Sequence, residues 1–134
     1  MPAHETPIRV RYGETDQAGV VYYGNYLLYF EQGRSEHMRA RGLPYSELER
    51  RGIFLTVADS YCKYLGTAAY DDLIVVRTRI TKVSLTRVTF EYEIARDDTG
   101  DIICTGSTIL ACIDANRKPR RLPDDVKAAL DVTP

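Results

Sequence analysis

The stretch YGETDQAGVVYYGNYLLYFE, residues 12–31, joins a loop with three glycines to the start of a long helical pattern. From Asn25 onward apolar side chains recur every three to four residues, through Leu27, Phe30 and Met38. This spacing predicts a helix with a broad apolar face. We expect Asn25 to cap the helix and Gly42 to end it. Such a face has to be buried against the rest of the chain.

The segments around this helix show the two-residue alternation of half-buried strands. Ile8, Val10 and Tyr12 alternate with arginines before the loop. Four longer strands are expected at 53–65, 74–80, 88–94 and 102–114, with a turn at 97–100. Short helices are expected after Pro44 and over 123–130. Strands that follow one long helix indicate an α+β fold in which an antiparallel sheet packs on the helix.

Length and charge limit the classes of protein. The 134 residues suit one domain, expected over residues 1–134. Lys and Arg total 18 and Asp and Glu total 19, for a formal net charge of −1. We therefore expect no nucleic-acid partner and no membrane surface. No stretch approaches the roughly 18 apolar residues of a membrane span, and no targeting segment is recognisable, so a reducing cytoplasm is the expected setting.

Cysteine and histidine usage gives no sign of a metal centre. Cys62, Cys104 and Cys112 lie in apolar, strand-like stretches and are expected to be buried free thiols. The two histidines, His4 and His37, belong to no cluster with metal-ligand spacing. We expect no metal and no other cofactor.

Asp16 is the candidate catalytic residue, because it lies in the glycine-containing loop just before the long helix. A helix start offers free N–H donors and the positive end of the helix dipole, which can hold an oxyanion. A carboxylate beside it could activate water or attack a carbonyl carbon. These are the parts that acyl hydrolysis requires. Spacing alone leaves open that Asp16 only binds the amides of its own loop.

Residues 12–31 closely resemble the signature of hotdog-fold thioesterases of the 4-hydroxybenzoyl-CoA thioesterase family. This family includes the acyl-CoA thioesterases associated with the Tol–Pal system. The likeness continues through residues 34–42, through Tyr70-Asp71-Asp72 and along the later strands, so it covers nearly the whole chain. It implies a hotdog fold, in which a curved five-stranded antiparallel sheet wraps a long central helix. It also implies homodimers that join their sheets and pair into tetramers, with active sites at subunit interfaces.

The resemblance also assigns roles in hydrolysing an acyl-CoA. The family's catalytic aspartate falls on Asp16, and its oxyanion donor, a backbone N–H at the helix start, falls on Tyr23 with Gly24 adjacent. Many relatives have histidine at the position of Tyr23, whereas the hydroxybenzoyl-type branch also has tyrosine, so this difference concerns the acyl group. Coenzyme A is part of the substrate, and the residues expected to bind its nucleotide end are Lys82, Ser84 and Arg87.

Alternatives remain at this point. Asp16 could act as nucleophile or as general base, and Glu31, further along the helix, is a second candidate carboxylate. A second basic cluster is either a solvated tail or a phosphate contact: Arg117, Lys118, Arg120 and Arg121. Besides a thioesterase for short-chain or aromatic acyl-CoA, the alternatives are an acyl-carrier-protein thioesterase, a dehydratase or a non-catalytic acyl-CoA-binding protein. Dehydratases of this fold use a histidine in the site, and His4 and His37 are poorly placed for that.

Overall fold

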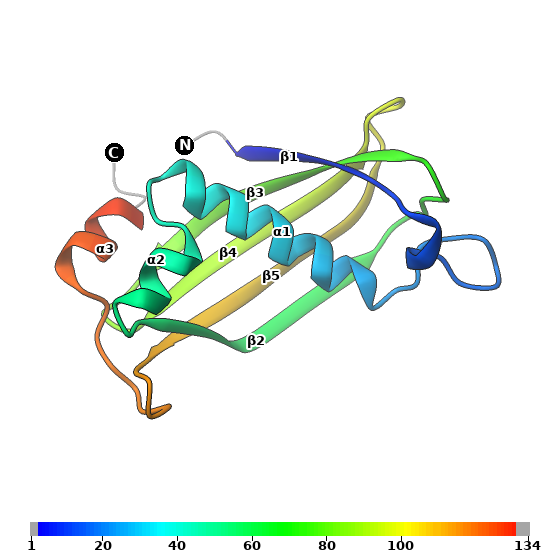
Figure 1. Ribbon diagram of the computed structural model, residues 1–134. Helices are drawn as coiled ribbons and strands as arrows, with labels where there is room; N and C mark the ends of the chain where they lie inside the picture. The colour runs from blue at the N-terminus through cyan, green and yellow to red at the C-terminus, as the bar shows by residue number, and fades with distance from the viewer. Residues whose placement is uncertain (1–2, 131–134) are drawn as a thin grey trace.

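A curved antiparallel sheet wraps one long helix in the computed structural model, which describes residues 3–130 (Figure 1). The strands are β1 (His4–Arg9), β2 (Phe54–Tyr64), β3 (Leu73–Val83), β4 (Arg87–Arg96) and β5 (Ile102–Ile113). They pair in the order β1-β3-β4-β5-β2, and each pairing is antiparallel. The helices are α1 (Asn25–Ala40), α2 (Tyr45–Arg50) and α3 (Asp124–Leu130), and a turn of 3-10 helix, η1, covers Tyr12–Glu14. The expected α+β hotdog fold is confirmed.

The single domain expected over residues 1–134 can be followed only through this described part. Residues 1–2 and 131–134 lie outside it. Between them, no helix is long and apolar enough to cross a bilayer. The cysteines are free thiols: Cys104 and Cys112 are buried, as expected, and Cys62 is half-buried.

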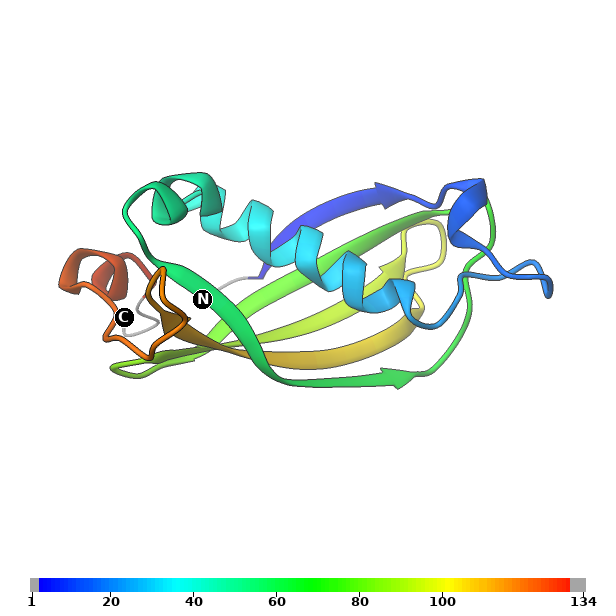
Figure 2. The ribbon, with the colours of Figure 1, turned by 60° about the horizontal axis from the view of Figure 1, so that its bottom comes forward.

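Helix α1 lies along one face of the sheet, and the two views in Figures 1 and 2 show the strands curving around it. The Phe30 ring stacks on Tyr92 of β4, with centroids 4.3 Å apart and planes 8° from parallel. At Gly33 a Cβ would come within 2.6 Å of the Thr78 hydroxyl, so glycine allows the helix to approach β3 closely. Leu27 was expected on this face but is 39% exposed, because the buried face of the first turns is formed by Tyr26, Tyr29 and Phe30.

The two ends of the loop before α1 differ from expectation. Tyr12 was expected in the first strand, but β1 ends at Arg9 and Tyr12 opens η1 with 77% of its surface exposed. Asn25 was expected to cap α1, but Gly24 occupies the N-cap and Asn25 is the first helical residue. The Asn25 side chain instead donates from Nδ2 to the carbonyl oxygen of Glu14, at 2.9 Å.

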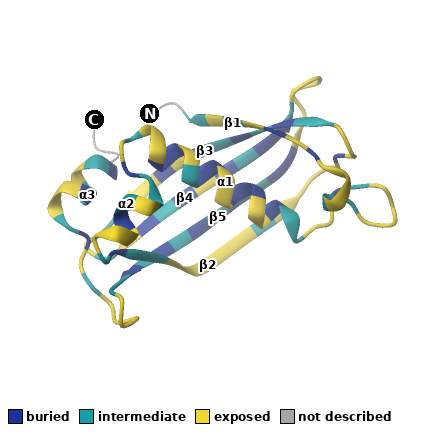
Figure 3. Ribbon diagram, in the orientation of Figure 1, coloured by how far each residue is buried: buried dark blue, intermediate teal, exposed yellow. Residues whose placement is uncertain are grey.

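The topology fixes which loops meet at each end of the sheet. Loop 13–24 and the start of α1 lie at one end, whereas α2, α3 and the β3–β4 turn lie at the other (Figure 1). Strand β2 is an edge strand that pairs only with β5 among the described residues. Its residues are mostly exposed, in contrast to those of β3, β4 and β5 (Figure 3).

Candidate active site

Loop 13–24 is a small hairpin that holds Asp16 at its corner. Thr15 pairs with Val21, and the Asp16 N–H donates to the carbonyl oxygen of Val20 at 2.9 Å. The turn closes through Gly19, whose φ of 84° favours glycine and whose N–H donates to the Asp16 carbonyl oxygen at 3.0 Å. The backbone of Asp16 is therefore bonded on both sides, which limits the positions open to its side chain.

The Asp16 carboxylate has one bound oxygen and one free oxygen. Oδ1 accepts from the N–H of Ala18 at 2.9 Å, which is the ordinary loop contact left open by the sequence. Within residues 3–130, Oδ2 has no hydrogen-bond partner. The exposed side chain lines a cavity of about 760 Å³ together with Tyr12, Gly13, Thr15, Gln17, Gly19 and Tyr70. A carboxylate with a free oxygen in an open cavity can take a proton from water or attack an electrophile.

The start of α1 carries two amides suited to an oxyanion. Within the described part of the chain, the N–H groups of Tyr23 and Gly24 donate to no acceptor, whereas those of Tyr22 and Asn25 do. They lie at the positive end of the α1 dipole. The Tyr64 hydroxyl donates to the Tyr23 carbonyl oxygen at 3.2 Å, and this contact holds the peptide between residues 23 and 24. Neither amide residue lines the Asp16 cavity, so a single chain gives carboxylate and amides no common enclosed space.

Glu14 joins the two halves of this site. Its carbonyl oxygen accepts from the N–H of Tyr22 and from Asn25 Nδ2, both at 2.9 Å. Its carboxylate accepts at Oε1 from the Arg11 N–H at 2.8 Å and from the Tyr29 hydroxyl at 2.9 Å. At Oε2 it accepts from Arg11 Nε at 3.1 Å. Sequence reasoning missed these roles, because the only signal was a glutamate two residues before Asp16.

The protonation states of Glu14 and Tyr29 follow from their surroundings. Burial raises the pKa of Glu14, but the hydrogen bonds from Arg11 and Tyr29 outweigh it and leave the pKa below its usual value. Burial, followed by the adjacent Glu14, raises the pKa of Tyr29. Glu14 is therefore a carboxylate and Tyr29 a hydroxyl donor at neutral pH.

A second loop, residues 66–72, supports the hairpin from outside. The N–H of Val21 donates to the Ala68 carbonyl oxygen at 2.8 Å, and Val20 pairs with Ala69. The N–H of Asp71 donates to the carbonyl oxygen of Val10 at 2.9 Å, which ties the same loop to the segment after β1. The position of the Asp16 hairpin therefore depends on that of loop 66–72.

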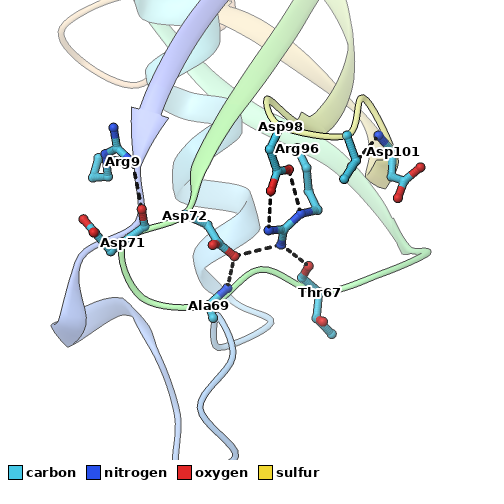
Figure 4. A network of polar contacts seen from close by, with 9 residues as sticks. Arg9, Thr67, Ala69, Asp71, Asp72, Arg96, Asp98 and Asp101 are labelled. Carbon is cyan, nitrogen blue, oxygen red and sulfur yellow. Dashed lines mark hydrogen bonds and ion pairs between the residues drawn. The ribbon is translucent and has the colours of Figure 1, made fainter.

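Arg96 of β4 fixes loop 66–72, as Figure 4 shows. Its Nη1 donates to Asp72 Oδ2 at 2.8 Å and to the Thr67 carbonyl oxygen at 3.5 Å. The same Asp72 oxygen accepts from the Ala69 N–H at 2.7 Å. The Ala69 amide and then Arg96 hold the pKa of Asp72 below its usual value. Asp98 occupies the other edge of the guanidinium, which leaves Arg96 little freedom.

The remaining candidates lie elsewhere. Glu31 is exposed on α1, where its Oε2 is 3.8 Å from Arg34 Nη2, and it does not line the Asp16 cavity. Lys82, Ser84 and Arg87 lie at the β3–β4 turn, at the opposite end of the sheet. Since β3 has 11 residues, that turn is on the order of 30 Å from the Asp16 end of the same chain. Ser84 Oγ accepts from the Arg87 N–H at 3.1 Å, within the turn.

The two basic clusters lie at the same end of the molecule. The N–H of Leu122 donates to the Leu85 carbonyl oxygen, and that of Cys112 to the Thr86 carbonyl oxygen, both at 2.8 Å. These bonds place the segment after β5 beside the β3–β4 turn. This segment carries four further basic residues: Arg117, Lys118, Arg120 and Arg121.

Comparison with known proteins identifies the family of this chain. Residues 10–130 match the model of the thioesterase-like superfamily. The chain belongs to the thioesterase-like superfamily. The resemblance seen in the sequence is therefore confirmed, and the match spans the Asp16 hairpin, the start of α1 and both basic clusters.

Proteins similar to this chain include a named relative and two solved structures. The acyl-CoA thioesterase YbgC of Haemophilus influenzae is 33% identical over 125 residues, which cover 92% of this chain and 90% of that protein. The DHNA-CoA thioesterase from Staphylococcus aureus is 37% identical, covers 91% of this chain and 82% of that one, and superposes with a TM-score of 0.87. A hypothetical protein from Thermus thermophilus is 34% identical over 94% and 95% of the two chains, with a TM-score of 0.89.

Proposed function

We propose that the chain is an acyl-CoA thioesterase in which Asp16 is the catalytic carboxylate and the amides of Tyr23 and Gly24 hold the thioester carbonyl oxygen. That it is a thioester hydrolase follows from its family and from the acyl-CoA thioesterases among its relatives. The observation that supports Asp16 is that its side chain lines an open cavity at the end of the sheet where α1 begins and keeps one carboxylate oxygen without a hydrogen bond in the described part of the chain.

The proposed chemistry uses each of these groups once. The thioester carbonyl oxygen accepts from the Tyr23 and Gly24 N–H groups, so its carbon becomes more electrophilic. Asp16 either attacks this carbon to give a mixed anhydride, or takes a proton from the water that attacks it. Negative charge then develops on the carbonyl oxygen, where the amides and the α1 dipole stabilise it. The coenzyme A thiolate leaves, and hydrolysis gives the free acid.

We also propose that the active unit is a homo-oligomer, with a dimer of dimers as the expected form. Strand β2 offers a long unpaired edge, and exposed apolar side chains lie along it and on the adjacent turn of α1: Leu27, Leu28, Val57, Tyr61 and Tyr64. A strand edge of this kind is normally covered. Pairing two β2 edges antiparallel around a twofold axis would bring the basic end of one copy toward the Asp16 end of the other.

This pairing accounts for the distant basic residues. Lys82, Ser84 and Arg87 of a second copy could then bind the phosphates of a coenzyme A whose thioester lies at Asp16 of the first. The second copy would also enclose the space that one chain leaves open between the Asp16 cavity and the α1 amides. The three free thiols suit the reducing cytoplasm proposed as the setting.

A panel of short-chain and aromatic acyl-CoA thioesters tests the proposed function. Purified protein is incubated with each thioester, and free thiol is followed over time. We expect turnover of at least one member of the panel. Saturable binding of acyl-CoA without thiol release from any member would instead support a non-catalytic acyl-CoA-binding protein. Parallel assays with the same acyl groups on acyl carrier protein show whether the protein prefers coenzyme A or acyl carrier protein.

A further inference from the structure

We infer that Glu14 is a positioning residue for the proposed reaction, holding Asp16 in register with the Tyr23 and Gly24 amides. This inference rests on the proposed function, since it concerns the same two catalytic parts. Its evidence is separate, because it comes from the contacts of Glu14, a residue that does not line the Asp16 cavity.

The main chain of Glu14 links the two parts directly. Its carbonyl oxygen accepts from Tyr22 N–H and from Asn25 Nδ2, and these two residues flank the amides at 23 and 24. Along the chain in the other direction, Glu14 is two residues before Asp16. One carbonyl group therefore connects the loop that carries the carboxylate to the helix start that carries the proposed oxyanion donors.

The side chain of Glu14 fixes that carbonyl in place. Tyr29, one turn along α1, and Arg11, before the loop, donate three hydrogen bonds of 2.8–3.1 Å to its carboxylate. Only 16% of the Glu14 side chain is exposed. The carboxylate thus bridges the chain before the hairpin to the body of α1, and Tyr29 is buried in the core.

The same contacts argue against Glu14 as the base. Both of its carboxylate oxygens are engaged, whereas Asp16 keeps one free oxygen in the cavity. A glutamine at position 14 keeps one acceptor oxygen but loses the negative charge, and its NH₂ group then faces the Arg11 Nε donor, so the charge-assisted hydrogen bonds that hold the residue are weakened. Asp16 keeps its own chemistry in that variant but loses its fixed position relative to the amides.

Replacing Glu14 is expected to lower kcat and to leave KM nearly unchanged. Glu14 contacts neither the cavity nor the basic clusters, so substrate binding is expected to survive its replacement. Glu14→Gln should lower kcat about 10- to 100-fold, the scale of a small misplacement of reacting groups. KM should stay within about threefold, since binding common to ground and transition states is kept.

Two further variants complete the test. Tyr29→Phe removes only the hydroxyl, so it should lower kcat in the same direction, and its effect should not add to that of Glu14→Gln. Glu36→Gln is the matched control, because Glu36 pairs with Arg39 at 3.5 Å on the distant part of α1. We expect wild-type kinetics from this control. If Glu14→Gln fails to fold, Tyr29→Phe alone carries the test.

Amide hydrogen exchange provides a readout without substrate. The Tyr22 amide donates to the Glu14 carbonyl oxygen, so its exchange should be faster in Glu14→Gln and Tyr29→Phe and unchanged in Glu36→Gln. Folded Glu14→Gln and Tyr29→Phe variants with wild-type kcat and wild-type exchange at Tyr22 would overturn the inference. So would loss of turnover in Glu14→Gln while Asp16→Asn stays active. If the wild type hydrolyses no acyl-CoA but Tyr22 exchange is faster in the two variants, the result contradicts the proposed function and leaves the positioning contacts supported.

Discussion

Glu14 and Asp16 are two carboxylates two residues apart, and their surroundings separate their roles. Glu14 lies at the base of the hairpin, where three hydrogen bonds to its carboxylate keep its pKa below the usual value. Asp16 lies at the hairpin corner, where one oxygen stays free in the cavity. A carboxylate that makes all its hydrogen bonds stabilises structure, and one with a free oxygen can react. The local contacts, rather than the residue type, distinguish the two.

His37 gives the fold a dependence on pH. It is 8% exposed, its Nδ1 makes no hydrogen bond in the described part of the chain, and its ring lies 5.3 Å from that of His4. Burial, with smaller effects of Arg41 and His4, lowers its pKa from 6.5 to about 4. His37 in the unfolded chain therefore becomes protonated as the pH falls through 6.5, whereas in the folded chain it stays neutral until about pH 4.

Stability should accordingly fall as pH drops through the window from 6.5 to about 4. We expect His37 to account for about 1–3 kcal/mol of this loss. The measurement is urea unfolding at pH 7 and pH 4.5 for the wild type and for His37→Leu. The variant should lose less stability between the two pH values. An equal loss in both proteins would show that His37 does not titrate in this way.

At the scale of elements, the Asp16 hairpin depends on loop 66–72, and that loop depends on Arg96 (Figure 4). The side chains of Arg96 and Asp72 are 25% and 24% exposed, so their ion pair is shielded more than a typical surface pair. Asp72 also accepts from the backbone of its own loop. A β4 residue thus holds a loop that lies 24 to 29 positions earlier in the chain, at Asp72 and Thr67.

Arg96→Ala should therefore loosen this end of the molecule before it unfolds the sheet. We expect a loss of about 1–2 kcal/mol in unfolding free energy, the scale of hydrogen bonds to a charged group. We also expect faster hydrogen exchange at the Val21 amide, which donates to Ala68. Arg50→Ala removes an exposed ion pair with Glu47 in α2 and serves as the control. Equal exchange at Val21 in the two variants would contradict the clamp.

Most elements could be predicted from periodicity, because α1, β3, β4 and β5 each bury one regular face, whereas β2 is mostly exposed. The errors occur where a distant contact overrides the local pattern. The alternation that includes Tyr12 suggests a strand, but the Glu14 carboxylate binds the Arg11 amide and the chain turns there. Asn25 is a residue type that often caps helices, but its side chain donates a hydrogen bond to the Glu14 carbonyl oxygen instead. No pattern in the sequence records such contacts.

The site could be predicted only in part for the same reason. Asp16 and the α1 start are close in sequence, so their common location at one end of the sheet follows from the chain order. The position of Lys82, Ser84 and Arg87 depends instead on strand direction, since β3 carries the chain away from the Asp16 end. The support from Tyr29 and Arg96 comes from tertiary packing, which spacing does not reveal.

At the scale of the whole molecule, one chain leaves β2 uncovered and leaves the proposed catalytic carboxylate and amides without a shared enclosure. Both features are consistent with an active site that a second copy completes. A β2–β2 pairing would join the sheets and cover the edge. The proposed activity should then depend on association.

Val57→Arg tests this dependence. Val57 lies in β2 and is 47% exposed in the single chain, so a charge there would be buried at the proposed contact. We expect a shift toward monomer in light scattering coupled to size exclusion, with loss of thiol release. Leu85→Arg makes the same kind of change at a 52% exposed position in the β3–β4 turn and should keep the oligomer. A fully active Val57→Arg monomer would contradict the shared site.

The central claim is that the Asp16 carboxylate performs the hydrolysis, and Asp16→Asn tests it most directly. The measurement is the rate of thiol release from an acyl-CoA that the wild type hydrolyses, with Glu31→Gln compared side by side. We predict that kcat falls at least ~10²-fold in Asp16→Asn, the scale of losing a catalytic acid or base, and that Glu31→Gln stays near the wild type. Undiminished turnover in Asp16→Asn, with the loss appearing in Glu31→Gln, would contradict the claim and move the chemistry onto α1.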